Sequence, residues 1–256
     1  MQYIIDDSDI VIEEKQYIGD IGAYRTHEDG KPYHTFRTQT ALVEGNNVIF
    51  RGCTFENNAG PGDKAGQAIA LYIDGDNIIC EDCVIKGNQD TLFVAPLPPK
   101  EYEVDGFLGP KQFTPRYERT AIFRNCIIEG SVDFIFGGAT CYFEECTFIS
   151  VAPGYVFAPC TPEGVKEGFV ARDCRFEARE GVPDESCFIA RPWREYGKVK
   201  LIDCYLGPHI NPKGWDDWGK KDAHDTILFE EYYTYGPGAD NWERPDYVKS
   251  DRVVSS

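Results

Sequence analysis

The chain has 256 residues, 42% of them hydrophobic and 14% aromatic, which is enough to bury a core in one larger all-β domain or two small ones. Its 43 acidic and 26 basic residues give a formal net charge of −17, and an acidic surface argues against nucleic acid and anionic membranes as partners. No stretch approaches the roughly 20 apolar residues of a membrane span.

The N-terminus, Met1-Gln2-Tyr3-Ile4-Ile5-Asp6-Asp7, has neither the basic nor the apolar region of a signal peptide. With ten cysteines, this favours a reducing cytoplasm as the location. A leader that had been trimmed would instead make the protein a secreted one.

Six cysteines lie in one recurring pattern. Apolar residues stand at offsets −5, −3, 0 and +2 from each cysteine, and polar residues dominate offsets −2 and −1. Such alternation is typical of strands. The two consecutive polar residues before the cysteine interrupt the alternation, which indicates a bend. Recurrence at this spacing predicts an all-β, right-handed parallel β-helix, a single-stranded solenoid with an internal cysteine ladder and long loops. The six are Cys53, Cys83, Cys126, Cys146, Cys174 and Cys204.

In such a ladder the cysteines act as small hydrophobes. Cys80 and Cys141 also fall at inward offsets, which removes most support for a redox or metal site at Cys80-x-x-Cys83. The four histidines show no paired ligand spacing, so we expect no zinc, no other metal and no cofactor.

Two segments interrupt or follow the repeat. Residues 94–115 contain Pro-Leu-Pro-Pro and two glycines, which predicts an extruded loop between coils. From residue 207 the repeat fades into a loop-rich flank, 207–256, in which 226–232 predicts one more strand.

Two aspartates share one offset. Asp90 lies seven residues after Cys83, and Asp133 lies seven residues after Cys126. Stacked coils would place the two carboxylates about 4.8 Å apart, so that one pKa rises and the pair offers a nucleophile and an acid at the same pH. The alternative is two unrelated turn aspartates.

The residues around these aspartates resemble the signatures of pectin methylesterases (pectinesterases), in the family's order from Thr35 to about Ala239. The matching segments are Gly66-Gln-Ala-Ile-Ala-Leu71, Gly87-Asn-Gln-Asp-Thr-Leu-Phe93, Gly130-Ser-Val-Asp-Phe-Ile-Phe-Gly137, Arg191-Pro-Trp193, and Gly214-Trp215 to Trp218 with Phe229-Glu-Glu-Tyr232 and Gly236-Pro-Gly. The family fold is a right-handed parallel β-helix, which agrees with the repeat.

The resemblance implies a role for each matching position. Asp133 matches the nucleophile that forms an acyl-enzyme, and Asp90 the acid that protonates methanol and then activates water. The other matches are Gln67 and Gln89 as oxyanion amides, Arg191 as the hydrogen-bond partner of the nucleophile, Trp193 as a sugar-stacking aromatic, and Thr35 as a substrate-binding threonine. We count Gln67 and Arg191 among the substrate-binding residues as well.

Structural explanations compete with each role. Gln67 and Gln89 could form an internal amide ladder, Arg191 could lie on the surface, and Trp193 in the core. Thr35 could be an ordinary strand threonine. Trp215 and Trp218 could either line the cleft or pack in the flank.

The sequence also departs from the family pattern. We interpret it as shortened at both ends, with 1–34 as an atypical N-terminal coil or cap of one domain that spans 1–256. Ala190 stands where the family usually has glycine, and a methyl group there could perturb the turn before Arg191. The long loop between Asp90 and Asp133 resembles a bacterial subset.

The expected function is removal of methyl esters from homogalacturonan or its oligosaccharides by a protein that we expect to be monomeric. One alternative is a pectate lyase or polygalacturonase, for which Asp216-Asp217 is the only pair of adjacent aspartates near the later motifs. Another is a non-catalytic polygalacturonate-binding β-helix.

Overall fold

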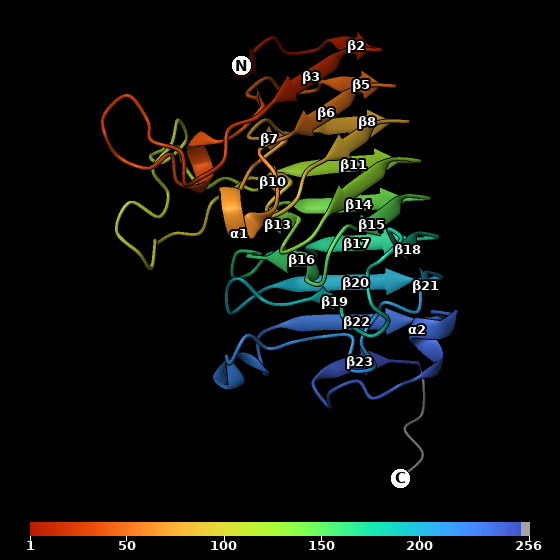
Figure 1. Ribbon diagram of the computed structural model, residues 1–256. Coiled ribbons are helices and arrows are strands. Elements are labelled where there is room, and N and C mark those ends of the chain that lie inside the picture. The colour runs from red at the N-terminus through yellow and green to blue at the C-terminus, as the bar shows by residue number, and fades with distance from the viewer. Residues whose placement is uncertain (252–256) are drawn as a thin grey trace.

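Short parallel strands stack into one elongated coil in the computed structural model, which describes residues 1–251 (Figure 1). Each of the first seven turns contributes one strand to each of three sheets, and β22 and β23 extend the second sheet alone, so hydrogen-bonded neighbours belong to successive turns. This is the parallel β-helix that the repeat predicted. Parallel strands joined by crossovers take the right-handed sense.

The strands and helices are as follows. The first sheet holds β1 (Tyr3–Ile5), β4 (Ala41–Val43), β7 (Leu71–Ile73), β10 (Leu92–Val94), β13 (Ile135–Gly137), β16 (Tyr155–Pro159) and β19 (Phe188–Ala190). The second holds β2 (Val11–Glu13), β5 (Ile49–Arg51), β8 (Ile78–Glu81), β11 (Thr120–Arg124), β14 (Thr140–Glu144), β17 (Phe169–Arg172), β20 (Lys198–Ile202), β22 (Leu228–Tyr232) and β23 (Val248–Ser250). The third holds β3 (Gln16–Gly19), β6 (Thr54–Asn57), β9 (Val84–Lys86), β12 (Ile127–Gly130), β15 (Thr147–Ser150), β18 (Arg175–Ala178) and β21 (Tyr205–Leu206). The helices are short: η1 (Thr35–Arg37), α1 (Gly62–Ala65), η2 (Lys221–Ala223) and α2 (Pro237–Asp240).

The repeating cysteine lies at the corner between the second and third sheets. The residue before it adopts a left-handed conformation in every coil, with φ 60° at Gly52, 49° at Asn125 and 56° at Glu145. This is the predicted bend, and it resets the inward–outward alternation between the two strands. The cysteines at this corner are at most 1% exposed.

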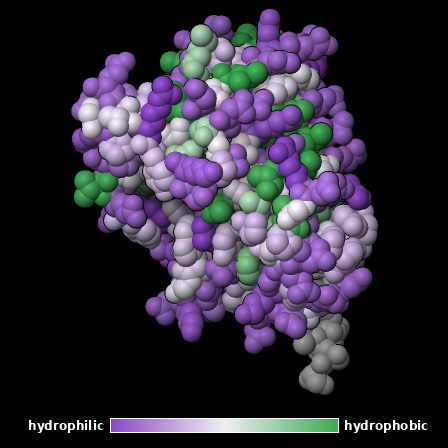
Figure 2. All heavy atoms as spheres, in the orientation of Figure 1, coloured by the Kyte–Doolittle hydropathy of each residue, from purple (hydrophilic) through white to green (hydrophobic). Residues whose placement is uncertain are grey.

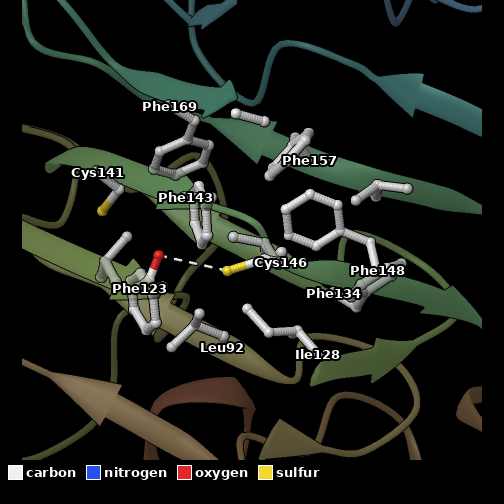
Figure 3. Close-up of a cluster of buried hydrophobic side chains, with 14 of the residues drawn as sticks. Leu92, Phe123, Ile128, Phe134, Cys141, Phe143, Cys146, Phe148, Phe157 and Phe169 are labelled. Atoms are coloured by element: carbon white, nitrogen blue, oxygen red, sulfur yellow. Dashed lines mark hydrogen bonds between the residues drawn. The ribbon is translucent and has the colours of Figure 1, made fainter. Parts of the chain in front are cut away.

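The inner side chains form one continuous core. Figure 3 shows its middle, where Phe123, Phe143 and Phe169 come from successive coils and the Cys146 thiol points to the Phe123 carbonyl oxygen at 3.3 Å. Phe123 and Phe143 stack with ring centroids 4.9 Å apart. All ten cysteines are buried and free, which fits their role as small apolar groups.

Loops project from one side of the coil (Figure 1). One, residues 20–34, follows the complete first coil of β1, β2 and β3; another, residues 95–119, lies where the sequence predicted an extruded loop. The C-terminal flank holds the predicted strand as β22 and, beyond the prediction, also α2 and β23. The last five residues of that flank, 252–256, lie outside the described residues.

The outer surface is mostly hydrophilic on the face shown in Figure 2. Two of the most exposed apolar side chains, Val104 at 88% and Phe113 at 90%, belong to the loop 95–119. Within residues 1–251, no helix has the length and apolar character needed to cross a membrane.

Candidate active site

Asp90 and Asp133 lie at equivalent positions of neighbouring coils. Each precedes a strand of the first sheet by two residues, and those strands pair with Leu92 opposite Ile135. The Asp90 amide donates to the Val132 carbonyl oxygen at 3.0 Å. Equal spacing from the two ladder cysteines therefore does place the aspartates side by side.

Arg191 holds Asp133 with two parallel hydrogen bonds. Its Nε donates to Oδ1 at 2.8 Å and its Nη2 to Oδ2 at 2.7 Å. The guanidinium also stacks on the Trp218 ring at 3.7 Å and on the Tyr155 ring at 4.0 Å. Its planar fork thus has a fixed orientation, so Arg191 is not a free surface arginine.

The two carboxyls differ in their proton affinity. Burial and the neighbouring Asp133 charge raise the pKa of Asp90 well above its usual range. Burial also raises the pKa of Asp133 above its usual value. The hydrogen bonds and charge of Arg191, and the charge of Lys220, oppose this increase and keep it smaller. Asp133 therefore loses its proton first, while Asp90 keeps one at the same pH.

Gln67 and Gln89 lie on successive coils next to the aspartates. The Gln89 carbonyl oxygen accepts from the Ala68 amide at 3.0 Å, which places the two glutamines side by side. In the part of the chain that the structure describes, neither side-chain amide donates to another residue. The amides do not form an internal ladder and are free to donate into the cleft.

All seven predicted site residues line one cleft of about 390 Å³. Thr35 contributes from η1, so it is not a strand residue as one interpretation had it. The predicted residues in the lining are Thr35, Gln67, Gln89, Asp90, Asp133, Arg191 and Trp193.

Aromatic side chains form one wall of this cleft. Trp193 is only partly buried and packs on a second apolar cluster outside the first sheet. Its ring lies 5.8 Å from Phe136 and 6.4 Å from Phe36, centroid to centroid, and both of those residues also line the cleft. Trp193 therefore belongs to the edge of a core and also lines the cleft.

The two tryptophans of the C-terminal flank lie in different environments. Trp218 is 38% exposed and lines the cleft, whereas Trp215 is 1% exposed and packs on Phe229. Asp216 and Asp217 form the turn between them, accepting from the Trp218 and Gly219 amides at 2.6 and 2.8 Å. The Asp216 and Asp217 carboxylates thus stabilise this turn.

Sequence reasoning missed several lining residues. The loop 95–119 contributes Glu101, Tyr102 and Glu103, and segments later in the chain contribute Arg194 and Lys220. Arg194 directly follows the Arg191-Pro-Trp193 motif, which was the one available signal. The loop residues and Lys220 had no such signal in the sequence, because only the folded loops bring them to the cleft.

Arg194 ties the loop to the body of the protein. Its guanidinium stacks on Tyr102 at 3.9 Å and donates to the Lys100 carbonyl oxygen at 3.2 Å, while Tyr102 donates to Glu195 at 2.6 Å. These contacts fix the loop 95–119 as one wall of the cleft.

Ala190 does not disturb the site. It ends β19 as a fully buried strand residue opposite Phe157, and its methyl group joins the core. Among residues 1–251, no cluster of three histidine, cysteine or carboxylate side chains could hold a metal ion.

Comparison with known proteins gives one family. The pectinesterase family model matches residues 14–97 and 115–255. The pectinesterase/pectinesterase inhibitor PPE8B of Prunus persica is 32% identical over an alignment of 231 residues, which covers 86% of this chain and 39% of the peach protein. This chain thus spans about two fifths of the length of that relative.

Solved structures show the same architecture. The pectin methylesterase of Aspergillus niger superposes with a TM-score of 0.77 at 25% identity, covering 100% of this chain and 79% of its own. A pectin methylesterase in complex with a hexasaccharide superposes with a TM-score of 0.77 at 22% identity, covering 98% of this chain and 80% of its own. The second similarity supports the fold alone.

Proposed function

Because this chain belongs to the pectinesterase family, we propose that it hydrolyses methyl esters of galacturonate units in pectin or pectic oligosaccharides. The products are methanol and a free carboxylate. The observation that supports this best is the asymmetric pair of aspartates, of which only Asp133 is held by a guanidinium.

In the proposed reaction, the Asp133 carboxylate attacks the ester carbonyl carbon and forms a tetrahedral intermediate. The Gln67 and Gln89 amides donate to its oxyanion, and one such donor is worth roughly 3 kcal/mol. Collapse breaks the bond to the methoxy oxygen, which takes the proton of Asp90 and leaves as methanol.

The second half restores the enzyme. Asp90, now ionised, takes a proton from water, and the resulting hydroxide attacks the acyl-enzyme carbonyl. The acyl bond breaks, Asp133 leaves as a carboxylate, and Asp90 carries its proton again. One water is consumed for each methanol released, and the carboxylic acid that forms gives its proton to solvent, so the net products are methanol, a carboxylate and one proton.

The cleft suits an acidic sugar chain. Arg194 and Lys220 line it without an ion pair among the described residues, although acids outnumber bases in the chain as a whole. Trp193 and Trp218 also line it, and indole rings suit contact with the apolar parts of sugars. Since one pectin methylesterase is known in complex with a hexasaccharide, we propose that this cleft takes a pectic oligosaccharide or a stretch of the polymer.

Two observations weigh against the alternatives. A polygalacturonase would need free, closely placed aspartates, whereas Asp216 and Asp217 accept hydrogen bonds within their own turn. A purely binding protein has no need for two unengaged amides beside a carboxyl pair.

The test is methanol release from methylated oligogalacturonates of increasing length and from methylated pectin. We expect methanol without new unsaturated or reducing ends, and we expect Asp133→Asn to lose at least about 10³-fold in kcat. Asp173→Asn is the matched control, since Asp173 has a similar φ of 53° at an exposed corner outside the cleft. Absence of methanol from every substrate would refute the proposal.

A further inference from the structure

A buried ion pair lies beside the site, at the end of the coil. Glu231 of β22 accepts from Arg244 at 2.9 Å to Oε2 and 3.0 Å to Oε1. The two side chains are 0% and 1% exposed. Trp215 completes the group, which we call the C-terminal brace, by donating its Nε1–H to Glu231 at 2.9 Å.

The brace is fully hydrogen-bonded. Glu231 also accepts from the Thr234 hydroxyl at 2.8 Å. Arg244 donates further to the carbonyl oxygens of Pro212 at 2.6 Å, Gly238 at 3.0 Å and Asn211 at 3.4 Å. Arg244 and Glu231 thus fasten the segment 211–215 to β22 and α2.

The fastened segment leads directly to the site. Trp215 bridges Ala190, the residue before Arg191, and the Asp216 amide donates to the Ala190 carbonyl oxygen at 3.0 Å. Three residues after Trp215, the Trp218 ring stacks on the Arg191 guanidinium. The brace is therefore connected to Arg191 in two ways, through the backbone contacts with Ala190 and through the Trp218 ring.

Stability alone is a poor explanation for such a pair. Removing two charges from water costs several kcal/mol per ion, and well-packed apolar residues of similar volume often stabilise a protein equally well. What an ion pair with five further hydrogen bonds adds is a single fixed geometry. That geometry is useful where a neighbouring guanidinium must meet a carboxylate in one orientation.

We propose that the Glu231–Arg244 pair positions the catalytic machinery: it fixes the segment 211–218 so that Trp218 and Ala190 keep Arg191 aligned on Asp133. This inference rests on the proposed function for its kinetic consequence, but the alignment of Arg191 can be measured without turnover. Glu231 and Arg244 are positioning residues, since neither lines the cleft.

The test compares Glu231→Gln with Glu230→Gln, its neighbour in β22. Glu230 pairs instead with Lys200 at 3.0 Å on the outer side of the sheet. We expect Glu231→Gln to lower kcat about tenfold and to move the acidic limb of the pH profile upward, because a looser Arg191 lowers the pKa of Asp133 less. Glu230→Gln should keep the wild-type profile within about twofold.

Two further measurements separate positioning from folding. In Glu231→Leu/Arg244→Met, apolar packing should restore the thermal midpoint while the upward shift of the acidic limb persists. By ¹⁵N NMR, hydrogen exchange at Arg191 Nε–H should be faster in Glu231→Gln than in wild type, whether or not methanol is released. Recovery of both midpoint and pH profile in the double variant, or unchanged exchange at Arg191, would overturn the inference. Wild type that releases no methanol would refute the proposed function alone.

Discussion

Asp90 and Asp133 occupy the same position in successive coils, both in the left-handed region with φ of 61° and 50°. They are 8% and 7% exposed, so both carboxyls are largely removed from water. Only Asp133 faces a guanidinium, and this one contact makes the pair asymmetric. Asp90 remains a buried carboxyl without such a partner, which has a consequence for stability.

We predict that Asp90→Asn stabilises the protein at neutral pH while it lowers activity. The folded state raises the pKa of Asp90 above the value near 3.9 of an unfolded chain. Above that value the unfolded chain binds fewer protons than the folded one, so Asp90 lowers the free energy of unfolding as pH rises. Asparagine has no such penalty. The thermal midpoint should rise by about 2–4 °C at pH 7, the shift expected for about 1 kcal/mol in a protein of this size.

The pH dependence is the sharper part of this prediction. The gain in midpoint should shrink as pH falls through about 3.9 and vanish below it, where Asp90 of the wild type is protonated in both the folded and the unfolded state. Asp173→Asn should show no such trend, since that side chain is exposed. An equal gain at pH 7 and at low pH would point to packing instead of the charge.

A second prediction concerns Gly62, the first residue of α1. A Cβ placed there would lie 2.4 Å from Gln89 Oε1 and 3.1 Å from Gln89 Cβ. Gly62→Ala should therefore push the Gln89 amide aside without removing it, and lower kcat by about 10-fold to 100-fold, less than Gln89→Ala. Asp63→Ala, one residue further along α1 and exposed, is the control. Full activity in Gly62→Ala would mean that Gln89 does not need its present position.

The sequence predicted the coil because the same pattern of apolar and polar residues recurs around each ladder cysteine. Each ladder cysteine points inward and follows a left-handed residue that is polar or glycine, so the local pattern also sets the register between coils, as Leu92 opposite Ile135 shows. The pair Asp90 and Asp133 could be placed for the same reason. The offset of each aspartate from its ladder cysteine can be read from a short stretch of sequence, without knowledge of the rest of the fold.

The rest of the cleft could not be predicted in this way. Tyr102 and Lys220 reach it from loops whose paths depend on contacts such as Arg194 with Tyr102, between residues far apart in the chain. Trp215 and Trp218 look equivalent in sequence, yet one packs in the core and the other faces the cleft. Their separation depends on Glu231, which accepts from Trp215 only after the flank has folded back onto β22.

A third prediction concerns His209, which is 2% exposed and whose two ring nitrogens have no partner among the described residues. Burial lowers the pKa of His209 to about 4. Between that value and about 6.5 the unfolded chain binds the proton and the folded protein does not, so stability falls as pH decreases through this window. We expect His209→Leu to reduce the loss of thermal midpoint between pH 6.5 and pH 4 by about 5 °C. Parallel midpoint curves for the two proteins would rule His209 out as the cause of acid sensitivity.

The last prediction tests the corner itself. Glu145 precedes Cys146 with φ 56°, where a side chain with a Cβ costs roughly 1–2 kcal/mol, whereas Gly52 occupies the same corner of another coil with φ 60°. Because the Glu145 side chain is exposed, Glu145→Gly should raise the free energy of unfolding by about 1 kcal/mol in a urea titration.

The reciprocal change, Gly52→Glu, should lower that free energy by a similar amount. A Cβ at Gly52 would meet nothing closer than Glu14 Cγ at 3.7 Å, so its cost is conformational and not steric. Asn125→Gly should change stability less than either, since asparagine tolerates the left-handed region better than glutamate. If Gly52→Glu proved neutral, backbone conformation at the corner would not be what selects the residue before each ladder cysteine.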